Sequence, residues 1–433
     1  MNSADFDVVI VGAGLVGLSL AAVLGDAGFR VAIVEAREPQ LDWAEDSVDL
    51  RVYAISRASE NLLRAAGAWP AIEPRACAYR DMRVWDAGGS GDIHFDSAEL
   101  GEPGLGYIIE SRVIEKALVE ALARLPAVER FCPVDIAAFA NTEDARCVEL
   151  EDGRRLSAPL LVGADGKHSR VRDYAGIHAR VSDYGQRALV AVVACERPHA
   201  HTAWQRFLPT GPLAFLPLCD GRCSIVWSAT SEEAERLLAL DDAAFCAALG
   251  EAFDHRLGAI LSVGERVLFP LQRQYAEHYI APRIALAGDA LHVIHPLAGQ
   301  GVNLGFKDVR ELADVLIDAR RRGRDPGAFS VLRRYERARK GDNLATMLAM
   351  DGFKQLFGSR VPPVRWLRNA GLDLVDAATP VKNLIMRLAM GLKPHVDMRD
   401  VAAGVRCRQA VRGGSAAGPA ATSALSPAEY RPW

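Results

Sequence analysis

The stretch Phe6-Asp-Val-Val-Ile-Val-Gly-Ala-Gly-Leu-Val-Gly17 decides what the start of this chain can fold into. Residues 8–11 are β-branched and apolar, as a strand buried in a parallel sheet requires. Residues 18–27 have the composition of a helix, and residues 30–34 form a second apolar run that leads to Glu35. The order of strand, glycine turn, helix and strand predicts a β–α–β unit.

Three glycines in this turn have separate mechanical roles. Gly12 permits a tight turn, Gly14 lets the backbone approach a pyrophosphate, and Gly17 lets the helix pack closely on the strand. Unpaired N–H groups at the helix start attract phosphate, and Glu35 is placed to accept hydrogen bonds from ribose hydroxyls. We therefore predict a dinucleotide site, although the same glycine pattern occurs in other turns and does not separate NAD from FAD.

Two later stretches also end an apolar run in a polar turn. Residues 160–163 lead into Asp165-Gly166, and residues 284–287 lead into Gly288-Asp289. An aspartate can accept a hydrogen bond from a hydroxyl or a backbone N–H, and a glycine permits close approach, but Asp-Gly is also an ordinary exit from a strand. After the second turn, Gly299-Gln300-Gly301 opens a helix with a regular apolar face.

Between residues 184 and 275, short β-rich runs alternate with glycine and proline turns, which predicts an antiparallel sheet. His199 and His201 have a spacing that a metal could use, but no third ligand is near them in the sequence, so we expect a surface loop and no metal site. Four aromatic residues are candidate walls of a substrate pocket, although most aromatic side chains of such a sheet belong to its core: Trp204, Phe207, Phe215 and Trp227.

Composition and charge exclude several classes of protein. The formal net charge is −4, whereas a nucleic-acid-binding surface carries a basic excess. No uncharged apolar stretch reaches the roughly 18 residues that cross a bilayer. Few residues precede the first apolar run, which leaves no room for a signal peptide. We therefore expect a cytoplasmic protein that does not bind nucleic acid.

The carboxyl-terminal part differs from the rest in composition. Residues 361–394 mix apolar and basic side chains in a way that suits amphipathic helices, which pack on the body of the protein or touch a membrane or a partner. Residues 413–427 are rich in Gly, Ala, Ser and Pro, which predicts a disordered tail.

Three features now stand in a fixed order: the glycine turn with Glu35, then Asp165-Gly166, then Gly288-Asp289. Together they resemble the class A flavoprotein aromatic hydroxylases, which use a single Rossmann unit for FAD. The run from His295 to Asp308, which contains Gly-Gln-Gly, is similar to the signature of the ubiquinone-biosynthesis hydroxylases. Further runs are also similar to that family: residues 49–56, 206–218 and 367–372.

The resemblance implies an α/β fold in which an antiparallel-sheet substrate domain is inserted into a Rossmann-like FAD-binding domain, followed by a C-terminal helical segment. We expect the FAD-binding domain in residues 1–78, 106–180 and 278–345. We expect the substrate-binding sheet in residues 79–105 and 181–277, the helical segment in 346–410 and the tail in 411–433.

The resemblance also implies FAD as cofactor and NAD(P)H as co-substrate. Arg51 is a candidate contact because a guanidinium binds phosphate in a bidentate way. Helical spacing over residues 109–125 puts Glu110 and Arg112 in a first turn, as cofactor contacts or as an exposed polar turn. The cofactor-binding candidates are Gly12, Gly14, Gly17, Glu35, Arg51, Arg112, Asp165, Gly166, Gly288, Asp289, Pro296, Gly299, Gln300, Gly301 and Asn303.

Within that set the resemblance suggests specific roles. Asp289 is expected at the ribityl or phosphate part of FAD, and Pro296 near the ring. Backbone N–H groups of residues 299–301 would stabilise negative charge on the reduced flavin. No convincing general base is found; His292 and His295 could serve, although loop structure or flavin packing explains them equally well.

The implied reaction is hydroxylation of the phenol ring of a polyprenylated ubiquinone precursor with NAD(P)H and O2. One alternative is hydroxylation of a small soluble aromatic acid. Another is a flavin-binding accessory protein of a biosynthetic complex. The expected partners are the hydrophobic phenol, O2, and either other ubiquinone-biosynthesis proteins or the inner face of the cell membrane, reached through residues 361–394.

Overall fold

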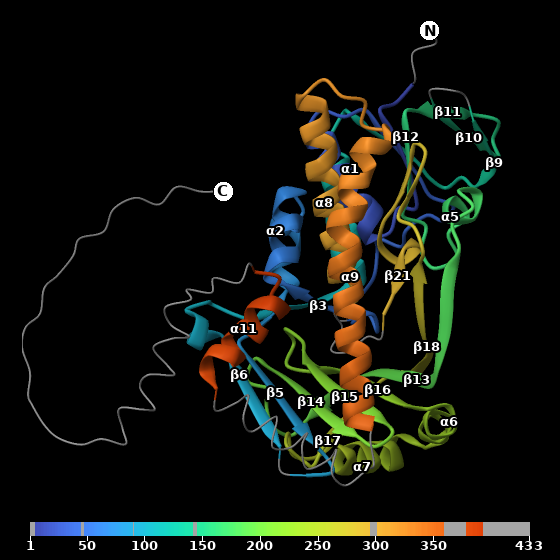
Figure 1. The fold of residues 1–433 in the computed structure, drawn as a ribbon. Coiled ribbons are helices and arrows are strands. Elements are labelled where there is room, and N and C mark those ends of the chain that lie inside the picture. The colour runs from blue at the N-terminus through green and yellow to red at the C-terminus, as the bar shows by residue number, and fades with distance from the viewer. Residues whose placement is uncertain are drawn as a thin grey trace, which may run out of the picture. The chain divides into compact units, whose positions relative to one another are not determined.

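The computed structural model of the chain describes residues 5–44, 47–89, 91–141, 145–294, 301–358 and 378–392. All of these belong to one unit, Met1–Leu392. Its larger sheets have six and nine strands, and two smaller sheets have three strands each (Figure 1).

The six-stranded sheet has the order β19-β20-β12-β1-β2-β8. Its central strand β1 pairs in parallel with β2 and with β12, and all four residues of β1 are buried. This confirms the predicted α/β class with a Rossmann-like unit. The strands are β1 (Val8–Val11), β2 (Val31–Val34), β8 (Val128–Phe131), β12 (Leu160–Gly163), β19 (Ile280–Ala281) and β20 (Ile284–Leu286).

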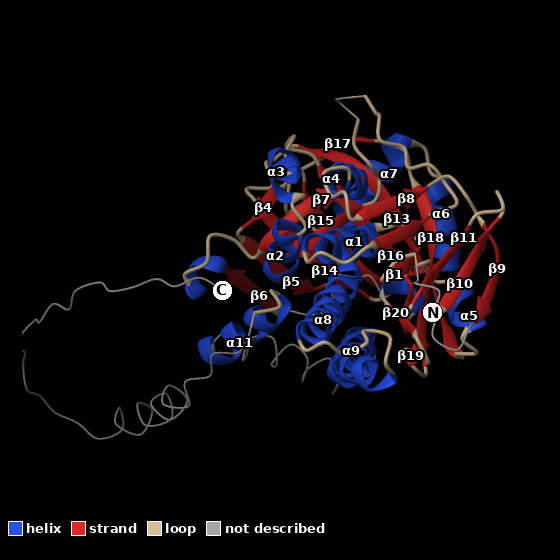
Figure 2. Ribbon diagram, turned by 90° about the horizontal axis from the view of Figure 1, so that it is seen from above, coloured by secondary structure: helices blue, strands red, loops and turns tan. Residues whose placement is uncertain are grey.

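Four long helices accompany this sheet (Figure 2). Helix α1 contacts both α4 and α8, and α9 packs on α8. The apolar face of α8, which includes Leu312 and Leu316, is buried as its spacing predicts. The helices are α1 (Leu15–Asp26), α4 (Ser111–Leu122), α8 (Gly301–Arg321) and α9 (Phe329–Gly358).

A three-stranded antiparallel sheet, β3-β7-β4, corrects one prediction. Residues 106–110 form strand β7, so the helix expected over residues 109–125 begins only at Ser111 and Glu110 ends a strand. The reason is tertiary: β7 pairs along its whole length with β3. The elements of this region are β3 (Val52–Ser56), α2 (Arg57–Ala65), α3 (Trp69–Ile72), η1 (Glu73–Arg75), β4 (Cys77–Tyr79) and β7 (Gly106–Glu110).

The nine-stranded sheet has the order β21-β18-β13-β16-β15-β14-β5-β6, with β17 paired to β13. It is antiparallel as predicted, except that β14 and β5 run parallel. Long strands β13 and β18 run side by side (Figure 1). The strands are β5 (Asp81–Asp86), β6 (Asp92–Asp96), β13 (Ala179–Cys195), β14 (Thr202–Leu208), β15 (Gly211–Pro217), β16 (Cys223–Thr230), β17 (Ile260–Val263), β18 (Val267–Ala276) and β21 (His292–Val293).

The two faces of this sheet have different neighbours. One face packs against α6 and α7 through residues such as Leu237 and Phe245. The other face packs against the β3-β7-β4 sheet and α11, through residues such as Val52 and Met386. We call this second face the inner face. The helices and the remaining short elements are α6 (Ser231–Ala239), α7 (Asp242–Ala252), α11 (Thr379–Ala389), β9 (Ile136–Asn141), β10 (Arg146–Leu150), β11 (Arg155–Ala158), α5 (Arg170–Tyr174), η2 (Ser97–Leu100) and η3 (Gly288–Ala290).

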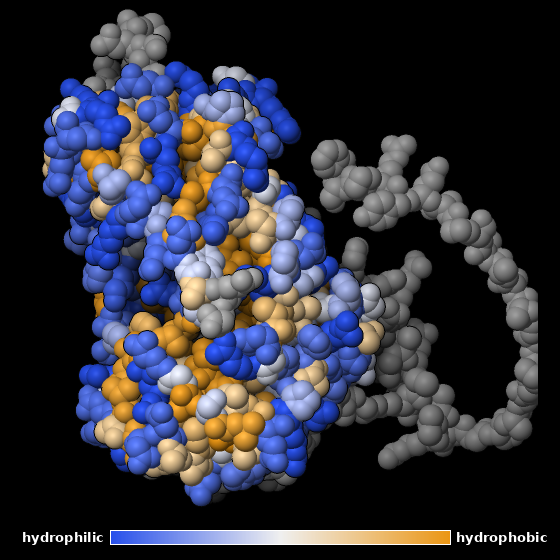
Figure 3. Space-filling model, turned by 180° about the vertical axis from the view of Figure 1, so that it is seen from behind, coloured by the Kyte–Doolittle hydropathy of each residue, from blue (hydrophilic) through white to orange (hydrophobic). Residues whose placement is uncertain are grey.

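The division into domains stays a prediction, and α9 runs without a break through residue 345. The predicted disordered tail lies outside the described residues, as does part of the predicted helical segment. Seen from behind, hydrophilic residues cover much of the described surface and hydrophobic residues gather in smaller patches (Figure 3). Among the described residues, the helices are too short or too polar to span a bilayer.

A buried carboxylate, Asp308 of α8, holds three other segments together. Its side chain accepts hydrogen bonds from Gly288 N at 3.1 Å, His292 Nε2 at 2.6 Å and Arg339 Nε at 2.9 Å. These partners lie in η3, β21 and α9. Burial pushes the pKa of Asp308 up, but His292 and Arg339 hold it below its ordinary value. The carboxylate is therefore charged and fixes the turn that follows β20.

Arg339→Met is expected to lower the free energy of unfolding by about 3–5 kcal/mol, because it leaves a buried charge without its guanidinium. Urea unfolding of the cofactor-free protein at pH 7 measures this loss. Arg310→Met removes an arginine that pairs on the surface with Asp314, so this control should change the free energy by less than about 1 kcal/mol.

The effect of Arg339→Met on stability should depend on pH. The folded-state pKa of Asp308 lies below its unfolded value of about 3.9, so its stabilising contribution is complete above that pH and is lost as the pH falls through the folded pKa. The stability difference between wild type and Arg339→Met must therefore narrow in acid. A difference that stays constant from pH 7 to pH 3 contradicts the assigned pairing.

Candidate cofactor site

The three sequence motifs meet at one edge of the six-stranded sheet. Strands β20, β12 and β1 are neighbours and parallel, so their carboxyl ends lie together. Gly12 lies so close to the next motif that a Cβ there would be 2.4 Å from Ala164 O, and its φ is +99°. A Cβ on Gly288 would lie 2.9 Å from the Val16 side chain. The absence of a side chain at Gly12 and at Gly288 therefore lets the three turns lie close together.

A hollow of about 390 Å³ opens at the glycine turn. Gly14 is the N-cap of α1, and no side-chain hydrogen bond caps it. Helix α1 therefore starts beside the hollow with no capping side chain, and N–H groups at a helix start attract phosphate. Among the candidates, Gly14, Glu35 and Arg51 line it. The complete lining is Ala13, Gly14, Leu18, Glu35, Arg37, Glu38, Pro39, Arg51, Glu115, Val119, Arg130 and Cys132.

Glu35 is held in place by backbone groups. Its Oε2 accepts a hydrogen bond from Ala13 N at 2.8 Å, and its Oε1 accepts one from Arg37 N at 3.1 Å. Each carboxylate oxygen keeps a further lone pair for a ligand hydroxyl. Glu115, which sequence reasoning missed, lines the same hollow; burial and then the charge of Glu35 raise its pKa. Its place inside a helix gave no local signal.

The two candidate arginines differ in position. Arg51 is exposed and lines the hollow. Arg112 instead donates from Nε to Glu110 Oε2 at 2.9 Å, and its guanidinium lies 4.7 Å from the centre of the Trp43 ring. It is not among the residues that line the hollow. The arginine that faces the predicted phosphate position is therefore Arg51.

Asp165 and Gly166 lie in the turn between β12 and α5. Asp165 Oδ2 accepts a hydrogen bond from Val171 N at 3.2 Å, whereas Oδ1 is buried and has no hydrogen-bond partner among the described residues. Burial raises the pKa of this carboxyl. Open space lies beside Gly166. The turn therefore presents one bare carboxylate oxygen next to the converging glycines.

Part of Asp289 is open to solvent, while nearby protein atoms crowd its carboxyl group. Desolvation raises its pKa, while His292, Arg51 and Lys167 act in the opposite direction. Its electrostatic coupling to Arg51 joins the third motif to the wall of the hollow. The placement agrees with the expected contact to the ribityl or phosphate part of FAD, which stays a prediction.

His292 and Asn303 have structural partners. His292 is 3% exposed and bonds Asp308, as described above. Asn303 Oδ1 accepts hydrogen bonds from Ser56 N at 2.9 Å and Ser59 Oγ at 2.7 Å, and its Nδ2 donates to Ala54 O at 2.7 Å. Both side chains tie the start of α8 to its surroundings. Gly301 opens α8. The candidates His295, Pro296, Gly299 and Gln300 lie outside the described residues.

The aromatic candidates lie on two faces of the nine-stranded sheet. Trp227 and Phe215 belong to the core under α6 and α7, and Trp204 packs against that core. Phe207 lies on the inner face with Val84. Three of the four are therefore core residues on the face away from the β3-β7-β4 sheet. Strand alternation separates them, and the sequence did not show which face would be covered by helices.

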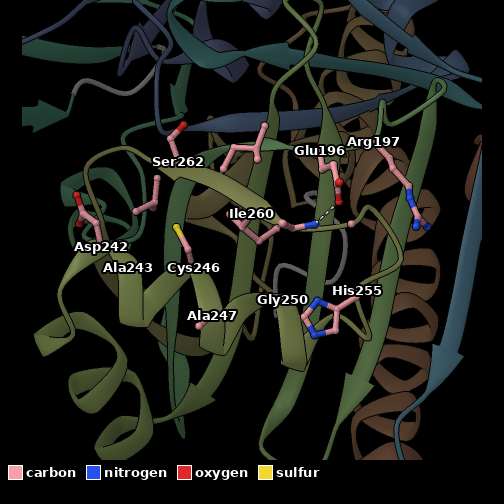
Figure 4. A pocket seen from close by; sticks show the side chains of 14 residues that line it. Glu196, Arg197, Asp242, Ala243, Cys246, Ala247, Gly250, His255, Ile260 and Ser262 are labelled. Atoms are coloured by element: carbon pink, nitrogen blue, oxygen red, sulfur yellow. Dashed lines mark hydrogen bonds between the residues drawn. The ribbon is translucent and has the colours of Figure 1, made fainter.

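A second, larger hollow of about 880 Å³ lies between α7 and β17 (Figure 4). None of its lining residues belongs to the six-stranded sheet or to the three motifs. Of the two acids in its wall, Glu196 accepts a hydrogen bond from Ala259 N at 2.9 Å, and Asp242 pairs with Arg266. Among the described residues no cluster of side chains could hold a metal ion. The smaller hollow is thus the one that gathers cofactor-binding chemistry.

Sequence comparisons agree with this geometry. A family model described as an FAD binding domain matches residues 5–343. The 3-demethoxyubiquinol 3-hydroxylase of Escherichia coli is 39% identical over 90% of this chain and 100% of its own length. Ubiquinone hydroxylase UbiL of Rhodospirillum rubrum is 40% identical over 89% of each chain. The human mitochondrial ubiquinone biosynthesis monooxygenase COQ6 is 37% identical over 89% of this chain and 92% of its own length.

Solved structures extend the comparison. PqsL of Pseudomonas aeruginosa in complex with 2-aminobenzoylacetate superposes with a TM-score of 0.71 at 26% identity, over 85% of this chain and 99% of PqsL. The p-nitrophenol 4-monooxygenase PnpA of Pseudomonas putida has a TM-score of 0.72 at 22% identity, over 90% of this chain and 98% of PnpA. The second similarity concerns the fold alone.

Two glycine variants test the geometry of the hollow. Gly12→Ala should lower the free energy of unfolding of the cofactor-free protein by about 3 kcal/mol, because its methyl group meets Ala164 and its φ is unfavourable. Gly14→Ala has an ordinary φ and open space around its Cβ, so its stability should change by less than about 0.5 kcal/mol.

Both variants should nevertheless purify with less bound flavin, because the hollow requires close backbone approach at each position. Urea unfolding gives the stability, and the flavin absorbance per protein gives the occupancy. A Gly14→Ala protein that retains the flavin content of the wild type would place the pyrophosphate elsewhere.

Proposed function

The chain belongs to the FAD-dependent hydroxylases of ubiquinone biosynthesis, and from that premise we propose that it hydroxylates the phenol ring of a polyprenylated ubiquinone precursor, using NAD(P)H and O2. The observation that carries the proposal is the similarity to the E. coli hydroxylase over that protein's whole length. The convergence of the three motifs at one edge of the six-stranded sheet supports it.

The residues of the hollow fit FAD. The α1 N-terminus at Gly14 would hold the pyrophosphate, Glu35 the adenosine ribose, and Arg51 with Asp289 the phosphate and ribityl region. When bound, FAD carries electrons from NAD(P)H to O2, which makes an oxygen atom available for the ring. Asp308 keeps the turn that carries Asp289 in a fixed position relative to the start of α8.

The inner face of the nine-stranded sheet is the proposed substrate side. On strands β13 to β16 the residues of this face are apolar or uncharged, which suits an apolar phenol and the exclusion of water from the reacting ring. The buried acid of this face, Asp86, lies on β5 beside Phe207. A small aromatic acid would instead need a cationic partner. The residues of strands β13 to β16 on this face are Gln186, Ala188, Val190, Val192, Ala203, Gln205, Phe207, Pro212, Ala214, Leu216, Ser224, Val226, Ser228 and Thr230.

The reaction can be tested directly. The purified protein should carry FAD and oxidise NAD(P)H faster when a short-chain prenylated phenol is added, and mass spectrometry should show a product one oxygen atom heavier. NAD(P)H oxidation that no phenol accelerates would favour the accessory role. Turnover of hydroxybenzoate but not of the prenylated phenol would favour the aromatic-acid hydroxylase.

Helix α11 is the proposed contact with lipid. Its inward side is anchored, since Lys382 Nζ lies 2.7 Å from Glu99 Oε1 and Met386 is buried. Its other side exposes four apolar residues at spacings of three and four, which form one face of a helix. They are Val381 (47% exposed), Leu384 (37%), Ile385 (36%) and Leu388 (54%). A prenylated substrate partitions into membranes, so we infer that this face of α11 contacts a lipid surface.

Flotation with phosphatidylcholine vesicles tests this contact. The variant Leu384→Ser/Leu388→Ser should reduce the vesicle-bound fraction about tenfold, because two apolar side chains lose their transfer into lipid. The matched control is Leu238→Ser on α6, which also replaces an exposed leucine (38%). Equal loss in both variants contradicts a specific role for α11, and binding to another protein without lipid would assign the face to a partner.

A further inference from the structure

We propose that Gln205 recognises the substrate by hydrogen-bonding the hydroxyl group of its phenol ring. Gln205 lies on β14, on the inner face of the nine-stranded sheet. The inference rests on the proposed function, because it names the polar contact through which that substrate is oriented.

Among the described residues, the Gln205 amide oxygen lacks the partner that a buried amide oxygen normally has. The residue is 5% exposed, and its Oε1 is buried without a hydrogen-bond partner among the described residues. Most buried side-chain polar atoms in native proteins are satisfied, so each exception needs an explanation. A ligand group that completes the amide's hydrogen bonds is one such explanation.

The surroundings of Gln205 are apolar. In the sheet register it is flanked by Val84 on β5 and Ala214 on β15. Along β14, the residues on the same face are Ala203 and Phe207. The Gln205 amide is therefore a polar group on an apolar part of the inner face. Ala203 and Ala214 have the shortest side chains among its four neighbours on this face. This arrangement suits an aromatic ring with one hydroxyl group.

The inner face near Gln205 is connected to the cofactor side through β3. Ala203 and Ala214 pack in the same cluster as Val52 and Ala54 of β3. The backbone of that strand also meets the start of α8, where Asn303 Nδ2 donates to Ala54 O at 2.7 Å. Tyr53, which alternates with these residues, is electrostatically coupled to Asp289. Strand β3 thus has neighbours both on the inner face and at the start of α8.

The Gln205 amide and a phenol hydroxyl group are complementary in hydrogen bonding. A phenol hydroxyl both donates and accepts, and so does a primary amide, so either orientation of the Gln205 amide can bind it. In a site that excludes water, a buried group built to bond a hydroxyl rejects the analogue that lacks it. The amide would therefore fix the orientation of the ring, while the prenyl chain contributes apolar contacts only.

Binding to the FAD-loaded protein tests the inference. The probes are 2-prenylphenol and 2-prenyltoluene, in which a methyl group replaces the hydroxyl, and the readout is the change in flavin absorbance on titration. The wild type should prefer the phenol by about tenfold or more, as expected for one hydrogen bond in a dry site. Gln205→Met, of similar length, should reduce this preference to about one.

The stability of the same variant separates recognition from structure. Removing an unsatisfied buried group should leave the melting temperature and flavin content of Gln205→Met equal to or above those of the wild type. A structural amide would instead lower both values, and that result overturns the inference. Ser224→Ala is the matched control, because Ser224 Oγ is also buried on this face without a partner among the described residues; it should keep the phenol preference.

Other results of the same titrations would overturn either the proposed function or the role of Gln205. A wild type whose flavin spectrum responds to neither probe overturns the proposed function itself. A wild type that prefers the phenol, with Gln205→Met or Gln205→Asn preferring it equally, overturns only the role of Gln205. The asparagine variant withdraws the amide by one methylene and keeps its polarity, so it also serves if the methionine variant fails to fold. Loss of the preference in Ser224→Ala as well overturns the assignment to Gln205.

Discussion

The buried carboxylate of Asp308 is the interaction on which the cofactor site depends. The turn after β20 carries Gly288 and Asp289, and its backbone would be free to move without a partner. Asp308 accepts from that backbone, from His292 and from Arg339. One charged residue on α8 therefore positions the third motif and binds α9 to the same core. Since removing any single partner leaves a buried group unsatisfied, the network holds together as a unit.

Much of the fold could be predicted because its signals are local. The β–α–β unit at the start follows from apolar runs and glycine spacing, and the strand-to-turn exits at Asp165 and Gly288 follow from the same kind of pattern. Glu35 was identified from its position at the end of β2, and the structure places it in the wall of the hollow. These inferences needed only a few neighbouring residues.

The remaining features depend on contacts between distant segments. The start of α4 is set by pairing of β7 with β3, which overrides the helical spacing of residues 109 and 110. Arg112 is drawn to Glu110 and Trp43, a choice that depends on how the loop before β3 folds back. The face on which Trp227 lies is fixed by α6 and α7. A sequence shows that residues alternate along a strand, but not which side the helices will cover.

The order of strands in the six-stranded sheet has a consequence for biosynthesis. Strand β1 comprises residues 8–11, yet its neighbour β12 comes from residues 160–163, and β20, the next strand in the sheet, comes from residues 284–286. Loop closure over such separations is slow, and domains complete their folding only when all their segments have been synthesised. The glycine turn is thus synthesised well before the strand at residues 284–286. The predicted cofactor site is complete only when the third motif has been made, so we expect the flavin to be acquired after Asp289 has been synthesised.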